Sequence, residues 1–321
     1  MPDGTTDHRP VPIGGVASPV GIGTEAPPAV EALGLEEHGL SQRTLAWRRF
    51  RRHRLAIASL IVLALIGLAT ALAPVIAPYG FSEQHLDQIL QAPSSRHLLG
   101  NDALGRDELS RMLYGGRVSL LVGLGVAFSA GVLGTLIGAA AGYYGGRLDN
   151  IVMRVTDLFL SIPLLVVLII ASRAAGGGVL AIVVVLSLVL WMPLARIVRG
   201  LFLSLKEKEF VEAARAIGAS NSRVIFRHLL PNTLGVIVVN VTLTVAQAIL
   251  LESLLSFLGF GIQPPTPSWG NMLEDGRGLM TVAGWLVWFP GLAILLTVLC
   301  VNFLGDGLRD VLDPTQRRVR A

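Results

Sequence analysis

Six long stretches of the chain contain no charged residue, and they dominate its pattern of hydrophobic and polar positions. Each stretch is rich in Val, Leu, Ile, Ala and Gly, and a helix needs roughly 20 such residues to cross the hydrocarbon core of a bilayer. The third run reaches that length only if its helix starts before Asp157. The pattern predicts six transmembrane helices, in the runs Leu55–Pro78, Val118–Gly146, Leu158–Ser172, Ala174–Ala195, Thr233–Leu251 and Leu279–Gly305.

Three glycines in the second run are spaced four residues apart, at Gly134, Gly138 and Gly142. Residues at this spacing lie near one face of a helix, where a second backbone can approach closely. We therefore predict that they form a helix-packing face. A groove that lines a substrate path is the alternative.

Prolines lie within or at the ends of several runs, at Pro163, Pro193 and Pro290. Because proline removes a backbone hydrogen bond, it allows a kink. Bent helices would suit a pore that changes shape, although membrane helices also tolerate proline without any such role.

The composition agrees with a membrane protein. The chain of 321 residues is 52% hydrophobic and 15% charged, whereas a soluble domain has about 25% charged residues. The single cysteine, Cys300, falls in the sixth run, so no internal disulfide can form and no cysteine-based metal site is indicated. No apolar core typical of a cleavable signal peptide is present in the first 40 residues.

The distribution of Lys and Arg predicts the orientation. If the N-terminus is cytoplasmic, the inner segments hold seven, two, seven and four of the 26 basic residues and the outer loops hold four, one and one. Since cytoplasmic loops carry the excess of positive charge, both termini are predicted to be cytoplasmic. The cluster "WRRFRRHR" at 47–54 directly precedes an apolar run, so it is read as a membrane anchor and not as a nucleic-acid patch.

The expected organisation follows from these segments. Residues 1–44 are rich in Gly, Pro and acidic residues and are expected to form a disordered cytoplasmic tail. Residues 45–114 would contain the first helix and an external loop. Residues 115–308 would form a membrane domain of five helices with a polar loop at 204–232, followed by a cytoplasmic tail at 309–321.

Four acidic residues are candidates for a chemical role. Asp157 and Glu252 are the only acids near hydrocarbon depth and both lie close to run ends. The lack of an acid at the midplane argues against a proton-coupled carrier. Glu252 is expected at the interface, satisfied by water or a partner, with a transport role as the alternative. Asp102 and Asp107 lack the spacing of a calcium loop. They are predicted to be turn or cap residues, with docking of an external partner as the alternative.

The polar loop at 204–232 has its own helical pattern. Gly218 is predicted to end a first helix as a left-handed cap, and Ser220 or Asn221 to start a second one that ends before Pro231. The apolar stripe of the first helix would contain Phe210, Ala213, Ala214 and Ile217. Such a pair of helices could lie on the lipid surface, but the small Ala213 and Ala214 and the acidic Glu212 favour a protein partner.

The same loop resembles a known motif. The sequence "EAARAIG", followed after nine residues by "HLLP", is similar to the cytoplasmic loop of binding-protein-dependent ABC importer permeases. His228 departs from the motif, where Ile is usual, and its role is not assigned. Further blocks at 97–123, 142–163, 252–273 and 302–314 resemble the C-type permease subunit of dipeptide, oligopeptide and nickel importers. The residues of the loop that match the motif are Glu212, Ala213, Ala214, Gly218, Leu230 and Pro231.

The resemblance implies an all-α membrane protein with the type I ABC importer permease fold. It implies that a second permease subunit completes the pore, that two cytoplasmic ATPase subunits bind the loop, and that an extracytoplasmic binding protein delivers substrate. The implied location is the bacterial inner membrane. Peptides are the first expectation for the substrate, with nickel chelates, glutathione or other small solutes as alternatives.

The residues also indicate that ATP is bound elsewhere. A phosphate-binding P-loop needs Gly directly before Lys, whereas Lys206 and Lys208 follow Leu205 and Glu207. We therefore expect no ATPase site, no cofactor and no metal in this chain. A stand-alone secondary carrier would show inverted repeats with ionisable groups at the midplane, and an intramembrane enzyme would show a catalytic motif. Neither pattern is found in the sequence.

Overall fold

The computed structural model describes residues 50–51 and 53–312, and this part of the chain contains helices and no β-strand. The predicted tail at 1–44 and the end of the chain after Leu312 lie outside the described residues. The last helix extends four residues into the predicted tail at 309–321.

Within the described residues, five helical stretches are long and apolar enough to cross a membrane. In the fourth, the short α10 (Asn221–Arg223) and the π-helical η2 (Val224–Leu229) continue directly into α11, so that the helical stretch runs from Asn221 to Phe257. The five long helices are α3 (Arg54–Ala71), α5 (Glu108–Tyr144), α8 (Val179–Leu205), α11 (Leu230–Phe257) and α13 (Trp285–Leu312).

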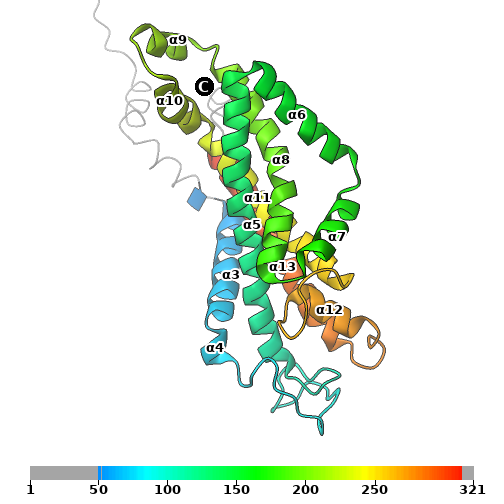
Figure 1. Ribbon diagram of the computed structural model, residues 1–321. Helices are drawn as coiled ribbons and strands as arrows, with labels where there is room; N and C mark the ends of the chain where they lie inside the picture. Colours follow the sequence, from blue (N-terminus) through cyan, green and yellow to red (C-terminus); the bar gives the residue numbers. More distant parts are fainter. Residues whose placement is uncertain (1–49, 52, 313–321) are drawn as a thin grey trace, which may run out of the picture. The chain divides into compact units, whose positions relative to one another are not determined.

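The remaining elements are short. They include α4 (Ala73–Ile76), which follows α3 directly, α9 (Glu209–Ala216) between α8 and α10, and α12 (Trp269–Arg277) between α11 and α13. Figure 1 shows α9 and α10 at one end of the long helices and α12 toward the other.

The third predicted span is a bent pair of helices and not one straight helix. Helix α6 (Gly146–Ser161) and helix α7 (Leu164–Ala175) meet at an angle of 95°. Pro163 has no N–H to continue the ladder, and Ile162 before it is extended, with ψ of 139°, as expected for a residue that precedes proline. In Figure 1, α6 leaves the long helices and α7 returns toward them. Pro193 and Pro290, in contrast, lie inside continuous helices.

Helix α5 is the centre of the packing. Its 37 residues make it about 55 Å long at a rise of 1.5 Å per residue. Gly134, Gly138 and Gly142 all face α8, and a Cβ atom added at these positions would lie 2.5 to 2.7 Å from atoms of α8. Backbone oxygens of Trp191 and Ala195 are the nearest atoms at the first two positions. Helix α8 therefore covers this glycine face, and a side chain there would force the two helices apart.

Two aspartates, Asp102 and Asp107, form the turn and the N-cap that precede α5. Asp107 is the N-cap of α5, where its carboxylate accepts hydrogen bonds from the Ser110 N–H at 2.8 Å and is joined to the His97 ring at 2.8 Å. Asp102 accepts from the N–H groups of Leu104 and Arg106, at 2.8 and 2.9 Å. Both acids thus have the turn and cap roles predicted from the sequence.

A largely buried ion-pair network joins the 79–107 loop and the start of α5 to α12. The guanidinium groups of Arg106 and Arg111 both contact one oxygen of Asp275, at 3.2 and 2.9 Å, and both also contact Asp102. The two arginine side chains are at least 89% buried. This network fixes the loop against α12, which is 164 or more residues away in the sequence.

Candidate functional site

Helix α9 is the polar element that the sequence singled out, and one face of it is anchored to the helix bundle. Val211 is fully buried in a cluster with Tyr143, Phe202 and Leu229, which come from α5, α8 and η2. Ala214, one turn further along, is also buried. The anchor is therefore apolar and draws on three other elements, so α9 has a defined position at the end of α5.

Gly218 ends α9 in the way the sequence predicted. Its φ is +83°, and the N–H groups of Gly218 and Ala219 donate to the carbonyl oxygens of Arg215 and Ala214, at 2.9 and 3.0 Å. These two bonds form a Schellman motif, which requires a left-handed residue at the position of Gly218. Ser220 then caps α10 by accepting from the Arg223 N–H at 3.4 Å. Four residues, 217–220, therefore separate α9 from α10.

The outward face of α9 is apolar along one stripe. Phe210 and Ile217 are 41% and 86% exposed, and Ala213 between them is exposed as well. The predicted stripe also contained Ala214, but the structure turns that residue inward, since it shares the buried face with Val211. Glu212 is exposed beside the stripe. The result is a stable ridge of apolar side chains that no described residue covers.

A second contact ties α9 and α10 to α5. The guanidinium of Arg215 lies 5.6 Å from the centre of the Tyr143 ring, and the Tyr143 hydroxyl donates to the Asn221 side-chain oxygen at 2.7 Å. Tyr143 is in the last turn of α5. Neither Tyr143 nor Val211 was predicted from the sequence, because Val211 lies off the apolar stripe and Tyr143 is 72 residues from Arg215 and 78 from Asn221.

The prediction that the second helix ends before Pro231 was wrong. Leu230 and Pro231 are the first residues of α11, which continues directly from η2. In η2 the hydrogen bonds widen, and the Leu230 N–H donates to the Ile225 oxygen five residues back. Asn232 donates its side-chain amide to the His228 oxygen at 2.6 Å. These bonds accommodate a proline that would otherwise break the ladder.

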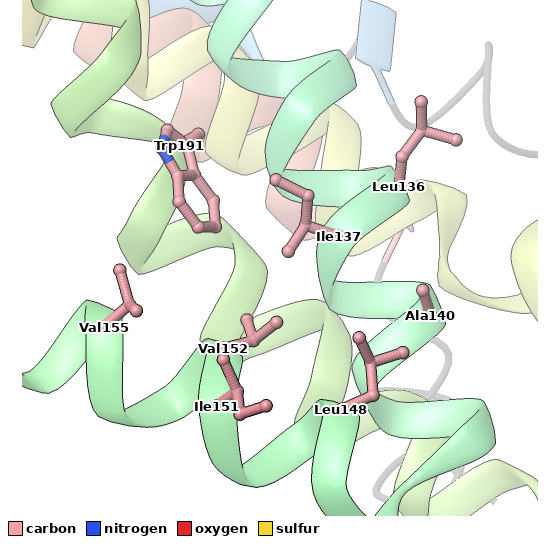
Figure 2. A pocket seen from close by; sticks show the side chains of 8 residues that line it. All are labelled: Leu136, Ile137, Ala140, Leu148, Ile151, Val152, Val155 and Trp191. Carbon is pink, nitrogen blue, oxygen red and sulfur yellow. The ribbon is translucent and has the colours of Figure 1, made fainter.

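An apolar cleft of about 430 Å³ lies between α5, α6 and α8. Figure 2 shows side chains of α6, among them Ile151 and Val155, on one side and those of α5 with Trp191 of α8 on the other. Two ion pairs hold α6 to α8 beside the cleft, Asp149 with Arg199 and Asp157 with Arg196. The cleft offers hydrocarbon and almost no polar surface, so it has no groups that would orient a peptide or an ion.

No group of three or more His, Cys, Asp or Glu residues that could hold a metal ion is found among residues 50–51 and 53–312. Asp102, Asp107, Asp149 and Asp157 are engaged instead by arginine, histidine or backbone N–H groups. The α9 ridge offers exposed apolar contact surface.

Comparison with known families identifies this arrangement. Residues 134–318, more than half of the chain, match the family described as the binding-protein-dependent transport system inner membrane component. The chain belongs to this permease family. Residues 41–93 of the permease also match the N-terminal transmembrane domain of oligopeptide transport permease C. With five or six apolar helices that could cross a bilayer, the permease is a multi-pass protein of the bacterial inner membrane.

Three named relatives match the permease over most of its length. The oligopeptide transport system permease protein OppC of Escherichia coli K12 is 46% identical over 285 residues, 88% of this chain and 94% of the relative. OppC of Haemophilus influenzae is 43% identical over 288 residues, 88% and 93% of the two chains. The dipeptide transport system permease protein DppC of Bacillus subtilis is 42% identical over 289 residues, 90% of each chain.

Proposed function

We propose that this permease is half of the translocation pore of an ABC importer for di- or oligopeptides. A second, related permease subunit completes the pore, two cytoplasmic ATPase subunits drive it, and an extracytoplasmic binding protein delivers the peptide. The names of the three relatives support the peptide substrate. ATP is bound by the ATPase subunits and not by this chain, and both chain termini are cytoplasmic.

The observation that carries the proposal is the apolar ridge on α9. Phe210, Ala213 and Ile217 face outward, while Val211 and the Schellman turn at Gly218 hold the helix in place. An exposed apolar ridge on a rigid support is typical of a protein docking element. The ridge fits a groove on an ATPase subunit, with Glu212 at its side.

The contacts between α9, α10 and α5 could transmit movement of the docking helix to the pore. Movement of an ATPase groove would displace α9, and the contacts of Arg215 and Asn221 with Tyr143 would pass that displacement to the end of α5. Because α5 packs closely on α8 through its glycine face, the two helices would move as one body. Motion driven by ATP at the α9 end of these helices would then change access to the pore at their opposite end.

The test uses the complex assembled with its ATPase subunits. Ala213→Arg places a long charged side chain on the ridge at a position where the fold has room, because Ala213 is exposed. We expect the amount of ATPase retained per permease in detergent to fall at least tenfold, as for the loss of a docking hot spot. Substrate-stimulated ATP hydrolysis in proteoliposomes should fall with it.

Ala103→Arg is the matched control, since Ala103 is an exposed alanine of the loop at the other end of α5. It should leave ATPase retention unchanged, and both variants should insert into the membrane at the level of the unmodified protein. Equal ATPase retention by the two variants would refute docking through α9.

A further inference from the structure

Glu252 is a carboxylate inside the helix bundle. It lies near the end of α11 that is furthest along the chain from α9, and its exposed fraction is 0%. The expectation of an interfacial residue satisfied by water or a partner was therefore wrong. The sequence could not reveal the burial, because the helix and the segment that cover Glu252 are brought together only by the fold.

Two serine hydroxyls bind the two oxygens of this carboxylate. Ser119 of α5 donates to Oε2 at 3.1 Å, and Ser256 of α11 donates to Oε1 at 2.8 Å. Each serine oxygen also accepts a backbone N–H, from Trp269 at 3.3 Å and from Ile262 at 3.1 Å. Glu252 thus ends two hydrogen-bond chains. Each runs from a backbone N–H through a serine hydroxyl to one carboxylate oxygen.

The Ile262 N–H belongs to the connection between α11 and α12 at 258–268, and the Trp269 N–H belongs to α12 itself. Trp269 is the first residue of α12, whose N-cap Ser268 forms a capping box with Asn271. A close contact adds to these bonds: a Cβ atom on Gly270, the second residue of α12, would lie 2.6 Å from the Ser253 Cα. The Gln263 N–H donates to the Gly177 oxygen, between α7 and α8, at 3.2 Å. Helices α5, α11 and α12 and the connection between α11 and α12 therefore meet around Glu252.

Simple packing does not account for an acid at this place. A carboxylate enclosed by protein loses its hydration and is retained in membrane helices mainly where it has a role. The hydrogen bonds of Glu252 are made with serine hydroxyls and not with a basic side chain. An apolar residue would fill the same space, but it would leave both serine hydroxyls without this acceptor.

We propose that Glu252 is a positioning residue that holds the 258–268 connection and the first turn of α12 against α5 and α11. Through the two serines it fixes one arrangement of this end of the permease, the end opposite the ATPase docking helix. The proposal rests on the proposed function only for its transport readout. The positioning itself concerns this chain alone.

Glu252→Gln tests the role with little change of shape. Its amide nitrogen cannot accept a hydrogen bond, so at least one serine hydroxyl loses its acceptor. In the assembled complex, we expect hydrogen exchange of the Ile262 or Trp269 amide, or of both, to accelerate at least tenfold. Exchange in residues 134–142 of α5 should stay within twofold of the unmodified protein.

Variants of one serine at a time distinguish the two hydrogen-bond chains. Ser119→Ala should accelerate exchange at Trp269 alone, and Ser256→Ala should do so at Ile262 alone. Ser129→Ala is the matched control, because Ser129 is also on α5 but pairs with Ser187 at 2.5 Å. It should change neither amide.

Unchanged exchange at both amides in Glu252→Gln would overturn the proposal. An equal rise throughout the described helices would overturn it too, because that result would indicate a general loss of stability. In proteoliposomes, Glu252→Gln should retain its ATPase subunits yet import several times less peptide per ATP hydrolysed. Failure of the unmodified permease to bind any ATPase would refute the proposed function and leave the exchange result intact.

Discussion

Alanine at position 138 would place a methyl group where α8 already lies. The added Cβ would be 2.5 Å from the Ala195 oxygen and 2.9 Å from the Ala195 Cα, whereas ordinary contact starts at 3.4 Å. Both atoms belong to the backbone, so no rotamer change can relieve the clash. Helices α5 and α8 would have to separate by several tenths of an ångström, and overpacking of this kind costs about 1 to 3 kcal/mol.

The same helix supplies a matched control. Gly125→Ala also adds a methyl group facing α8, but its nearest neighbour, the Val183 Cγ1, lies at 3.4 Å. Both substitutions gain the helix propensity of alanine over glycine, worth about 1 kcal/mol, so this contribution cancels in the comparison. The difference between the two variants isolates the cost of the close contact.

Unfolding of the purified permease by titration with a denaturing detergent measures this difference. We expect Gly138→Ala to be about 1 to 3 kcal/mol less stable than Gly125→Ala, and ATP-driven uptake to fall with it, since α5 and α8 could no longer move as one body. If the two variants were equally stable, the close packing of α5 on α8 would not be what the glycines provide.

Two further predictions concern the ends of the molecule. Gly218→Val forces a β-branched residue into a φ of +83° with open space around it, so it should cost about 1 to 3 kcal/mol of backbone strain and lower ATPase retention. Gly200→Ala, in an open helical position, should do neither, and equal retention by both would refute the role of the cap. Asp275→Asn leaves two buried arginines with one carboxylate fewer, so it should lower the unfolding free energy by about 1 to 3 kcal/mol. Glu274→Gln, which breaks a more exposed pair on the same helix, should change it by less than 0.5 kcal/mol or so, and matching losses would show that the buried network adds nothing.

Much of the fold was predictable because long apolar runs in the sequence identify membrane helices. Five of the six charge-free runs correspond to single long helices, since a lipid-facing helix must be apolar over its whole length. The third run was different. Pro163 was recognised as a possible kink, but the size of the bend, 95°, depends on how α6 and α7 pack and cannot be read from one proline.

Local signals predicted the end of α9 and the caps near α5, since these depend on a few neighbouring residues. Gly218 forms the expected left-handed cap and Asp107 the expected N-cap. Pro231 misled the prediction, because the wider hydrogen bonds of η2 let the helix continue through it. The assignment of Glu212, Ala213 and the other loop residues to ATPase docking stays a prediction.

Contacts between distant segments were beyond the sequence. The burial of Glu252 arises because Ser119 on α5 and Trp269 on α12 are brought to it from 133 residues away and from a later helix. Likewise, nothing local to Tyr143 shows that its hydroxyl meets Asn221. Such pairs become visible only once the helices are placed.

Site-directed crosslinking can detect a contact between α9 and an ATPase subunit directly. The only cysteine, Cys300, is buried, so a Cys300→Ser protein can carry one new cysteine at position 213 or at position 103, each labelled with a short photo-crosslinker. In the assembled importer, we predict that Ala213→Cys crosslinks to an ATPase subunit and that Ala103→Cys does not. A complex that retains its ATPases but gives no crosslink from position 213 would contradict the account.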